Sequence, residues 1–378
     1  MRIEADWLEA APTQTVMAML DRRGHAALAV GGCVRDALIG RPCADIDIAT
    51  DAPPERVLAL AEADGLRAVP TGLDHGTVTV IAGDVPHEVT TFRRDVETDG
   101  RHARVAFSDD PAEDAARRDF TMNALYARAD GTLVDPLGGL PDLQARRVRF
   151  IGAAEARIRE DYLRILRFFR FTARFGRDLD PEGLAACAAE QEGLDHLSRE
   201  RVGQEMRKLL AAPDPAPCVA AMAQASILAR VLPGADPRAL APLVHLEGGR
   251  APDWLCRLAV LGGDPTALRL SNAEMRTLTT LRDAEGGPFA LGDALGEGRG
   301  VDALLIRAAS LGVPPDPGAV AAVSAGAEAE FPLAAADLMP TLQGPALGAA
   351  LTRARAAWAE SEGRLDARAL RDVALGGR

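Results

Sequence analysis

The first 150 residues alternate short apolar runs with polar segments that contain glycine or proline, a pattern that favours a small domain of strands and helices. Five runs are rich enough in apolar or β-branched residues to predict strands or strand ends. They are AALAVGG (26–32), ADIDIAT (44–50), TVTVIAG (77–83), HEVTTF (87–92) and GTLVDPL (131–137). We therefore expect a small mixed sheet in this part of the chain.

The pattern changes to helical spacing after residue 150. Residues 155–175 contain no proline and predict one helix, and residues 199–210 predict another. Beyond residue 211, prolines and glycines recur between alanine-rich helical pieces, so we expect only helices there. The predicted fold class is therefore mixed α+β, with an N-terminal domain over residues 1–148 and helical segments over 149–212 and 213–378.

Composition narrows the class of protein. The chain has 378 residues, of which 48% are hydrophobic and 26% charged, as in a folded globular protein of two or three domains. No apolar run approaches the roughly 18 residues of a membrane span, and the acidic N-terminus does not resemble a secretory signal. Five widely spaced cysteines without a CxxC pair argue against disulfides or zinc and predict a cytoplasmic location. The net charge of −12 leaves room only for a local nucleic-acid site.

The strongest chemical signal is VGGCVRDALIGRPCADIDIAT (30–50). Glycines 31 and 32 allow close approach of a ligand, and Arg35 follows in the first turn of a predicted helix, where it could meet a phosphate. Asp45 and Asp47 alternate with isoleucines, so both carboxylates lie on one face of the strand. A DxD pattern alone is more often an amphipathic strand with a polar outer face. Together with the glycine turn and the arginine, it predicts a Mg²⁺ site for phosphoryl transfer.

GGxVRD followed by DxD resembles the class II nucleotidyltransferases of the polymerase-β superfamily, which comprise CCA-adding tRNA nucleotidyltransferases and bacterial poly(A) polymerases. The resemblance implies that Asp45 and Asp47 are catalytic and bind Mg²⁺, and that Gly32 and Arg35 hold the triphosphate. It also makes Glu88 a candidate third carboxylate, although a strand glutamate is more often simply solvated.

A second motif is RRDFTMNAL (117–125), which by itself predicts the start of a helix with Phe120, Met122 and Leu125 packed inward. Two arginines near a helix N-terminus are unfavourable unless an anion or acid is nearby. The motif is similar to RRDFTxNAL of the same family, which implies that Arg118 contacts the nucleotide.

The third motif is REDYLRILRFFRFTARFG (159–176), in which Arg164, Arg167 and Arg170 recur every three residues among apolar side chains. Each arginine is turned about 60° from the last. Because apolar residues occupy nearly every side, we expect a buried helix whose arginines meet something anionic. Asp161 and Arg164, three residues apart, can form one polar unit.

The family resemblance gives this helix a specific role. EDxxR (160–164) is similar to the amino-acid template of the family, which implies that Asp161 and Arg164 hydrogen-bond the base of CTP or ATP, and that Arg167 and Arg170 contact the nucleotide. The polarity is consistent, because a carboxylate accepts from the amine that C and A share and a guanidinium donates to a ring nitrogen or carbonyl. Glu200 and Arg201, in the next helix, we interpret as structural.

Residues 90–110 are charged and predict a solvated loop. In the family this position is a flexible loop that takes part in switching from C to A addition. Arg101, His102 and Ala103 stand where relatives commonly have RHP. The basic signature typical of poly(A) polymerases around this strand is missing, which favours CCA addition.

Taken together, the resemblance implies a magnesium-dependent nucleotidyltransferase head (1–148), a nucleotide-selecting neck (149–212) and a tRNA-binding body and tail (213–378). The implied reaction adds C, C and A to the 3′ end of tRNA from CTP and ATP, with no stable protein partner. Poly(A) addition, CC-only or A-only addition, and a non-catalytic RNA-binding protein stay open as alternatives. We further predict a positive cleft lined by Arg118, Arg164, Arg167 and Arg170.

Overall fold

The computed structural model describes residues 1–43, 45–97 and 104–376, which form two compact units. The first unit comprises Met1–Arg201 with Ala225–Ile227, and the second comprises Val202–Gln224 with Leu228–Arg378. Every predicted site residue lies in the first unit. The domain boundaries at residues 148 and 212 stay predictions.

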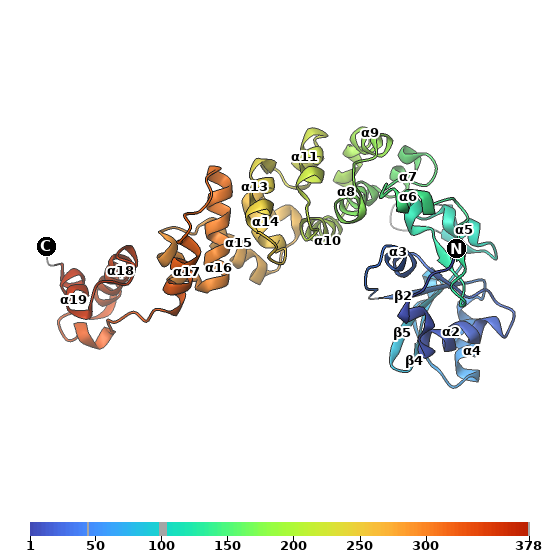
Figure 1. The fold of residues 1–378 in the computed structure, drawn as a ribbon, viewed down its shortest axis with the longest axis horizontal. Helices are drawn as coiled ribbons and strands as arrows, with labels where there is room; N and C mark the ends of the chain where they lie inside the picture. The colour runs from blue at the N-terminus through green and yellow to red at the C-terminus, as the bar shows by residue number, and fades with distance from the viewer. Residues whose placement is uncertain (44, 98–103, 377–378) are drawn as a thin grey trace. The chain divides into compact units, whose positions relative to one another are not determined.

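A seven-stranded mixed sheet organises the first unit (Figure 1). Its strand order is β3 (Arg67–Gly72), β4 (Thr77–Ala82), β5 (Val85–Thr91), β2 (Ile46–Thr50), β1 (Leu28–Val30), β8 (Tyr126–Ala127) and β9 (Leu133–Val134). Neighbouring strands are antiparallel except β2 and β5, which are parallel. All five predicted strand regions contribute a strand, which confirms the mixed α+β class. β3 and β8 were not predicted, since one contains a proline and the other has only two residues.

The two faces of the sheet differ. Helices α2 (Ala11–Asp21) and α4 (Pro54–Ala63) pack against β4 and β5. Val78 and Val80 of β4 and Val89 of β5 are fully buried, whereas the residues between them are more exposed. Because side chains alternate along a strand, the residues that alternate with these valines lie on the opposite face. That second face carries the acidic residues of the site.

The charged stretch that follows β5 is more ordered than a solvated loop. Strands β6 (Arg93–Glu97) and β7 (Arg104–Phe107) pair antiparallel and form a separate two-stranded sheet. The loop expected over residues 90–110 is therefore corrected for its described part. Arg101, His102 and Ala103 lie outside the described residues.

The helix predicted over residues 155–175 is interrupted. It is divided into α7 (Ala154–Glu160) and α8 (Leu163–Phe175), and Asp161 between them is extended, with φ −156° and ψ 104°. The Asp161 carboxylate accepts a hydrogen bond from the N–H of Leu163, a local interaction that competes with helix continuation. The expectation of one continuous helix was wrong at this residue.

The remaining helices of the first unit are α1 (Asp6–Glu9), α3 (Gly32–Leu38), α5 (Pro111–Ala116), α6 (Leu140–Gln144) and α9 (Pro181–Ala189). Helix α10 (Arg199–Leu210) has the predicted bounds, and its last nine residues belong to the second unit.

The second unit is helical, as predicted, throughout the residues that the structure describes. Its further helices are α11 (Ala216–Gln224), α12 (Ile227–Val231), α13 (Leu240–Leu246), α14 (Trp254–Leu261), α15 (Asn272–Arg282), α16 (Pro288–Leu311), α17 (Ala319–Glu328), α18 (Gly344–Glu360) and α19 (Ala367–Leu375). Arg257 is fully buried at its core, where Glu247 and main-chain carbonyls satisfy the guanidinium. Among the described helices, none has the length and apolar character needed to cross a membrane.

Candidate active site

Acidic side chains meet on the open face of the sheet. Asp47 is the second residue of β2, and Asp45 immediately precedes that strand. The parallel pairing of β2 with β5 puts Asp47 directly beside Glu88. Ile48, one position along, is fully buried on the other face, and Ile46 is half-buried. The alternation predicted for the two aspartates is therefore present, and the sheet register adds Glu88 to their surroundings.

The electrostatics of this group indicate a site for a cation. Burial raises the pKa of the Asp47 carboxyl to about 6, the neighbouring Glu88 and Asp45 add to the rise, and Arg118 opposes it. Asp45 and Glu88 are exposed, so the face stays open to a ligand. A carboxylate whose ionisation is opposed by its neighbours is stabilised by a divalent ion with oxygen preference.

The donor set has the chemistry of an open magnesium site. Within the described ranges, no three Asp, Glu, His or Cys side chains converge tightly enough to hold a metal by themselves. Mg²⁺ is usually held by one or two carboxylates together with waters and substrate phosphates, and Asp45 and Asp47 can supply that share. Glu88 as a third ligand stays a prediction.

The glycine turn lies between β1 and α3. Gly31 has a φ of 75°, in the region that L side chains rarely adopt, and its N–H donates to the carbonyl of Leu125. A Cβ on Gly31 would lie 3.3 Å from an Nη atom of Arg118. The helix expected over residues 34–39 is α3, which begins two residues earlier, at Gly32. The turn therefore favours glycine for its backbone conformation, and a side chain there would crowd the guanidinium of Arg118.

Arg118 links this turn to the carboxylates. Its guanidinium donates to Asp114 at 2.9 Å, and the hydroxyl of Tyr126 donates to the same carboxylate oxygen at 2.8 Å. Because its charge also lowers the pKa of Asp47, the cation lies within electrostatic reach of the acidic face. The structure thus brings together Gly31, Arg118 and Asp47, which are far apart in sequence.

The motif that contains Arg118 does not begin a helix. Helix α5 ends at Ala116, so Arg117 and Arg118 follow its C-terminus, where cations are favourable. Residues Thr121–Asn123 form a 3₁₀ turn. The predicted inward packing of the apolar side chains is nevertheless confirmed, since Phe120, Met122 and Leu125 are fully buried.

A chain of buried hydrogen bonds connects this motif to α3 and α8. Arg35 donates to the Asn123 side-chain oxygen at 2.6 Å, Asn123 donates to Asp119 at 2.9 Å, and Arg167 donates to Asp119 at 2.8 Å. Arg35 is 7% exposed, pairs with Asp36 and lies over the Phe175 ring at 4.0 Å. The structure therefore engages Arg35 inside the protein, and its contact with a phosphate stays a prediction.

Asp161 and Arg164 have separate partners. Arg164 pairs with Glu160 at 2.5 Å and donates to the carbonyl of Arg157 at 2.7 Å. Asp161 pairs with Arg201 at 2.6 Å. Their side chains do not form the polar unit that the spacing predicted.

The anion expected beside the buried arginines of α8 is supplied by the protein itself in two cases. Glu160 pairs with Arg164, and Asp119 pairs with Arg167. Sequence reasoning missed Arg201 as the partner of Asp161, because 40 residues separate the two. It also missed Arg157, which donates to the carbonyls of Arg117 and Arg118 and pairs with Glu160. The sequence carries no local signal for the contacts of Arg201 with Asp161 or of Arg157 with the two carbonyls, whereas Arg157 and Glu160 are only three residues apart on α7.

Several arginines of this region lie over the rings of two phenylalanines of α8. The rings of Phe171 and Phe175 lie 5.5 Å apart. Guanidinium groups lie over one or both rings, and they belong to Arg35, Arg41, Arg167, Arg170 and Arg174. We call these seven residues the arginine–phenylalanine cluster. Arg118 and Arg164 do not belong to this cluster. Arg118 donates to Asp114, and Arg164 donates to the carbonyl of Arg117.

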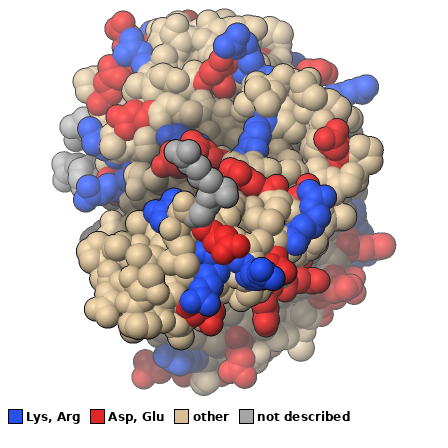
Figure 2. All heavy atoms as spheres, turned by 90° about the vertical axis from the view of Figure 1, so that its left-hand side faces the viewer, with Lys and Arg blue, Asp and Glu red and all other residues tan. Residues whose placement is uncertain are grey.

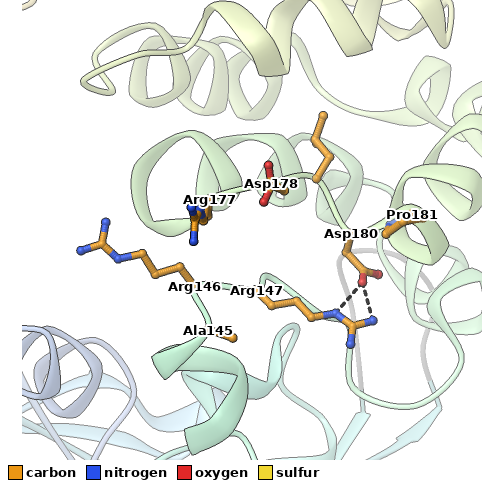
Figure 3. A pocket seen from close by; sticks show the side chains of 8 residues that line it. Ala145, Arg146, Arg147, Arg177, Asp178, Asp180 and Pro181 are labelled. Carbon is orange, nitrogen blue, oxygen red and sulfur yellow. Dashed lines mark hydrogen bonds and ion pairs between the residues drawn. The ribbon is translucent and has the colours of Figure 1, made fainter.

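One hollow on the first unit lies outside this site. It has a volume of about 260 Å³ and is lined by residues 145–147 and 177–181 (Figure 3). Its Arg147 reaches across to Asp180 at 2.6 Å, whereas Arg146 extends to the opposite side. None of the predicted site residues lines it.

On the face shown in Figure 2, basic and acidic side chains are interspersed, so positive charge is not spread over that surface.

Comparisons with known proteins agree with these motifs. The family described as "Poly A polymerase head domain" matches residues 27–149, and the family described as "Probable RNA and SrmB- binding site of polymerase A" matches residues 177–238. A solved Bacillus stearothermophilus CCA-adding enzyme in complex with CTP is 32% identical, with a TM-score of 0.72 over 93% of both chains. The chain belongs to the CCA-adding enzyme and poly(A) polymerase family.

Curated relatives in this family match over part of their length. The human mitochondrial CCA tRNA nucleotidyltransferase 1 is 45% identical over 193 residues, which cover 50% of this chain and 44% of the relative. The CCA-adding enzyme of Geobacillus thermodenitrificans is 42% identical over 221 residues, which cover 58% of this chain and 54% of the relative. The chain thus spans about half the length of the curated family members it matches. A Thermotoga maritima CCA-adding enzyme complexed with tRNA, at 18% identity and a TM-score of 0.69, shares the fold.

Proposed function

We propose that this protein adds C, C and A to the 3′ end of tRNA, using CTP and ATP and releasing pyrophosphate. The observation that carries the proposal is the position of Arg118, which lies beside Gly31 and within electrostatic reach of Asp47, in a chain similar over 93% of its length to a CCA-adding enzyme. Relatives named as CCA tRNA nucleotidyltransferases at 45% identity support the choice of reaction.

Asp45 and Asp47 are the residues that would hold Mg²⁺, and the ion would supply activation of the attacking hydroxyl and charge stabilisation at the phosphate. The 3′-hydroxyl of the tRNA attacks the α-phosphate of the bound nucleotide, the α–β bridging bond breaks, and pyrophosphate leaves. Arg118, which lies beside Gly31, would balance negative charge that develops on the triphosphate. Gly32 and Arg35 complete the proposed triphosphate site.

Nucleotide selection falls to Asp161 and Arg164 in this proposal, with Arg167 and Arg170 contacting the nucleotide. The amine shared by C and A donates to the Asp161 carboxylate, whereas U presents an oxygen there and is repelled. Arg201 and Glu160 hold the two reading side chains by ion pairs before the nucleotide arrives. Preformed partners restrict the side chains to one orientation, which favours discrimination over adaptability.

The test is extension of a tRNA that lacks its CCA end, with Mg²⁺ and each nucleoside triphosphate, read as product length on a gel. CTP and ATP together should extend the RNA by three nucleotides and then stop, and the Asp47→Asn variant should leave it unextended. A long ladder with ATP alone would identify a poly(A) polymerase instead. Arrest after two nucleotides, or addition of a single A only to tRNA ending in CC, would identify a split activity.

We also propose that the helical segments contact tRNA and that the protein works in the cytoplasm. The family match over residues 177–238, described as an RNA-binding site, supports the first proposal. All five cysteines are free, which supports a reducing compartment. Cross-linking of bound tRNA to peptides from residues 213–376 tests the first, and cell fractionation tests the second.

A further inference from the structure

The arginine–phenylalanine cluster contains arginines that have no role in the proposed nucleotide site. Within it, Arg35 pairs with Asp36, and Arg167 pairs with Asp119. Arg41 and Arg174 lie over the same Phe175 ring, at 5.1 and 5.5 Å from its centroid. Neither makes a side-chain hydrogen bond or ion pair with any residue in the described part of the chain.

Both guanidinium groups therefore lie against one aromatic ring, over which Arg35 also lies, at 4.0 Å from the centroid. Arg174 also repels Arg35, whose pKa is lowered mainly by burial and further by this neighbour. Like charges brought together without an anion destabilise a fold, and solvent only partly screens them. An aromatic ring beneath a guanidinium keeps its plane in place and leaves its hydrogen-bond donors free for a planar or tetrahedral oxyanion.

The positions of Arg41 and Arg174 connect them to the proposed reaction. Arg41 follows α3 and precedes Asp45 by four residues, and Arg174 lies in the last turn of α8. Arg174 is seven residues beyond Arg167 and so shares its helix face to within about 20°. From Arg164 to Arg174 the helix rises roughly 15 Å, a length that an RNA strand covers in several nucleotides.

We propose that Arg41 and Arg174 bind a backbone phosphate of the tRNA strand whose 3′-hydroxyl reacts at Asp45 and Asp47. The inference rests on the proposed function and adds two residues that the sequence motifs did not single out. The triphosphate of the incoming nucleotide has its own proposed site at the glycine turn with Gly32, Arg35 and Arg118. Arg35 lies over the same Phe175 ring, but Asp36 and Asn123 already engage its guanidinium. Because Arg41 and Arg174 have no such partner among the described residues, we assign the phosphate that they bind to the RNA, where it would fix the position of the strand behind the reacting end.

The test compares two double variants of the full chain that lose the same charge. Arg41→Gln with Arg174→Gln removes the proposed site. Arg56→Gln with Arg128→Gln removes two other exposed arginines of the same unit, neither of which has an ion pair within the residues described. The dissociation constant of tRNA lacking CCA is measured against salt concentration for each protein, without nucleotide.

We expect the Arg41/Arg174 variant to bind tRNA about tenfold more weakly at low salt, with a log K against log [salt] slope shallower by about 1. The Arg56/Arg128 control should bind like the wild type. The variant with Arg41→Lys and Arg174→Lys should retain most of the slope of the wild type, because it keeps both charges. Equal slopes for the two glutamine variants would overturn the proposal.

A second measurement separates the two sources of phosphate. The Kd of CTP in the absence of RNA should be the same in wild type and in the Arg41/Arg174 variant. If CTP binding weakens tenfold while tRNA binding does not, the phosphate belongs to the nucleotide and the inference is wrong. Failure of the wild type to extend tRNA would contradict the proposed function, whereas the binding slopes test Arg41 and Arg174 independently of extension.

Discussion

The two parts of the candidate site treat charge in opposite ways. At the sheet, burial and the neighbouring Glu88 and Asp45 raise the pKa of Asp47, and the charge of Arg118 opposes the rise. At the junction of α7 and α8, Asp161 and Arg164 each have an ion-pair partner already in place. This difference supports the proposal that a cation and phosphates from outside complete the first part. In the same proposal the second part is preorganised, so that a nucleotide base would meet side chains with a defined orientation.

The largest effect should follow from removing one negative charge from the acidic residues at the sheet. Asp47→Asn should reduce the rate of nucleotide addition by at least about 10³-fold, because a ligand for the cation at the reacting phosphate is lost. Single-turnover extension of tRNA at saturating CTP measures this. The folded protein without metal should be no less stable than the wild type, since the substitution removes a repelled carboxylate. A variant that retained more than a tenth of the rate would contradict the role of Asp47.

The pH dependence of stability offers a second test of the same carboxylate. Because the pKa of Asp47 is raised to about 6 in the folded protein, the folded state binds more protons than the unfolded state between pH 4 and 6. Without Mg²⁺, this group should lower the free energy of unfolding by up to about 3 kcal/mol as pH rises through that window. Urea titrations at pH 5 and pH 7.5 measure the change, with Asp47→Asn as the control that lacks it.

Magnesium should reverse the loss above pH 6, where Asp47 is ionised, and have little effect at pH 5. The readout is the shift in Tm on adding Mg²⁺, which requires no substrate. An equal shift for the wild type and for Asp47→Asn at pH 7.5 would mean that the ion binds elsewhere.

Breaking the buried hydrogen-bond chain that runs through Asn123 should lower the stability of the first unit, which holds both parts of the site. Asn123→Ala leaves Arg35 and Asp119 each without one buried partner and should cost about 1–3 kcal/mol in the free energy of unfolding. Chemical denaturation measures it. Thr132→Ala, which removes an exposed hydrogen bond to Asp130, is a suitable control and should cost much less. Equal losses for the two variants would contradict the role of the chain.

The smallest effect should follow from a change at the ion pair of Asp161, in the part of the site where the side chains already have partners. Arg201→Gln removes the ion pair that orients Asp161 and should lower the preference for CTP over UTP by about tenfold, with little change in the rate with CTP. Competition between labelled CTP and UTP measures the ratio. Arg207→Gln, which breaks an ion pair to Glu274 from the same helix α10, is the matched control. An unchanged ratio in Arg201→Gln would mean that Asp161 does not need this partner.

Patterns of period two and period three to four were enough to predict the elements that have them. The alternation in residues 44–50 predicted β2 with both aspartates on one face, and the spacing in residues 199–210 predicted α10 at its observed bounds. Residues 117–125 misled the prediction, because Asp119 accepts from the backbone N–H of Phe120 and from Asn123 and favours a turn instead of a helix.

The strands and helices with regular patterns, the mixed α+β class and the motif residues could all be inferred from the amino-acid sequence. The positions of the charges relative to one another depend on how the chain folds: Asp47 lies beside Glu88 through a parallel strand pair, Asp161 pairs with Arg201, and Arg41 and Arg174 lie over the ring of Phe175. The difference lies in how far apart in the sequence the interacting residues are. Hydrogen bonding and burial along one element leave a period in the sequence, whereas an ion pair between residues 40 or more positions apart depends on how the elements pack and leaves none.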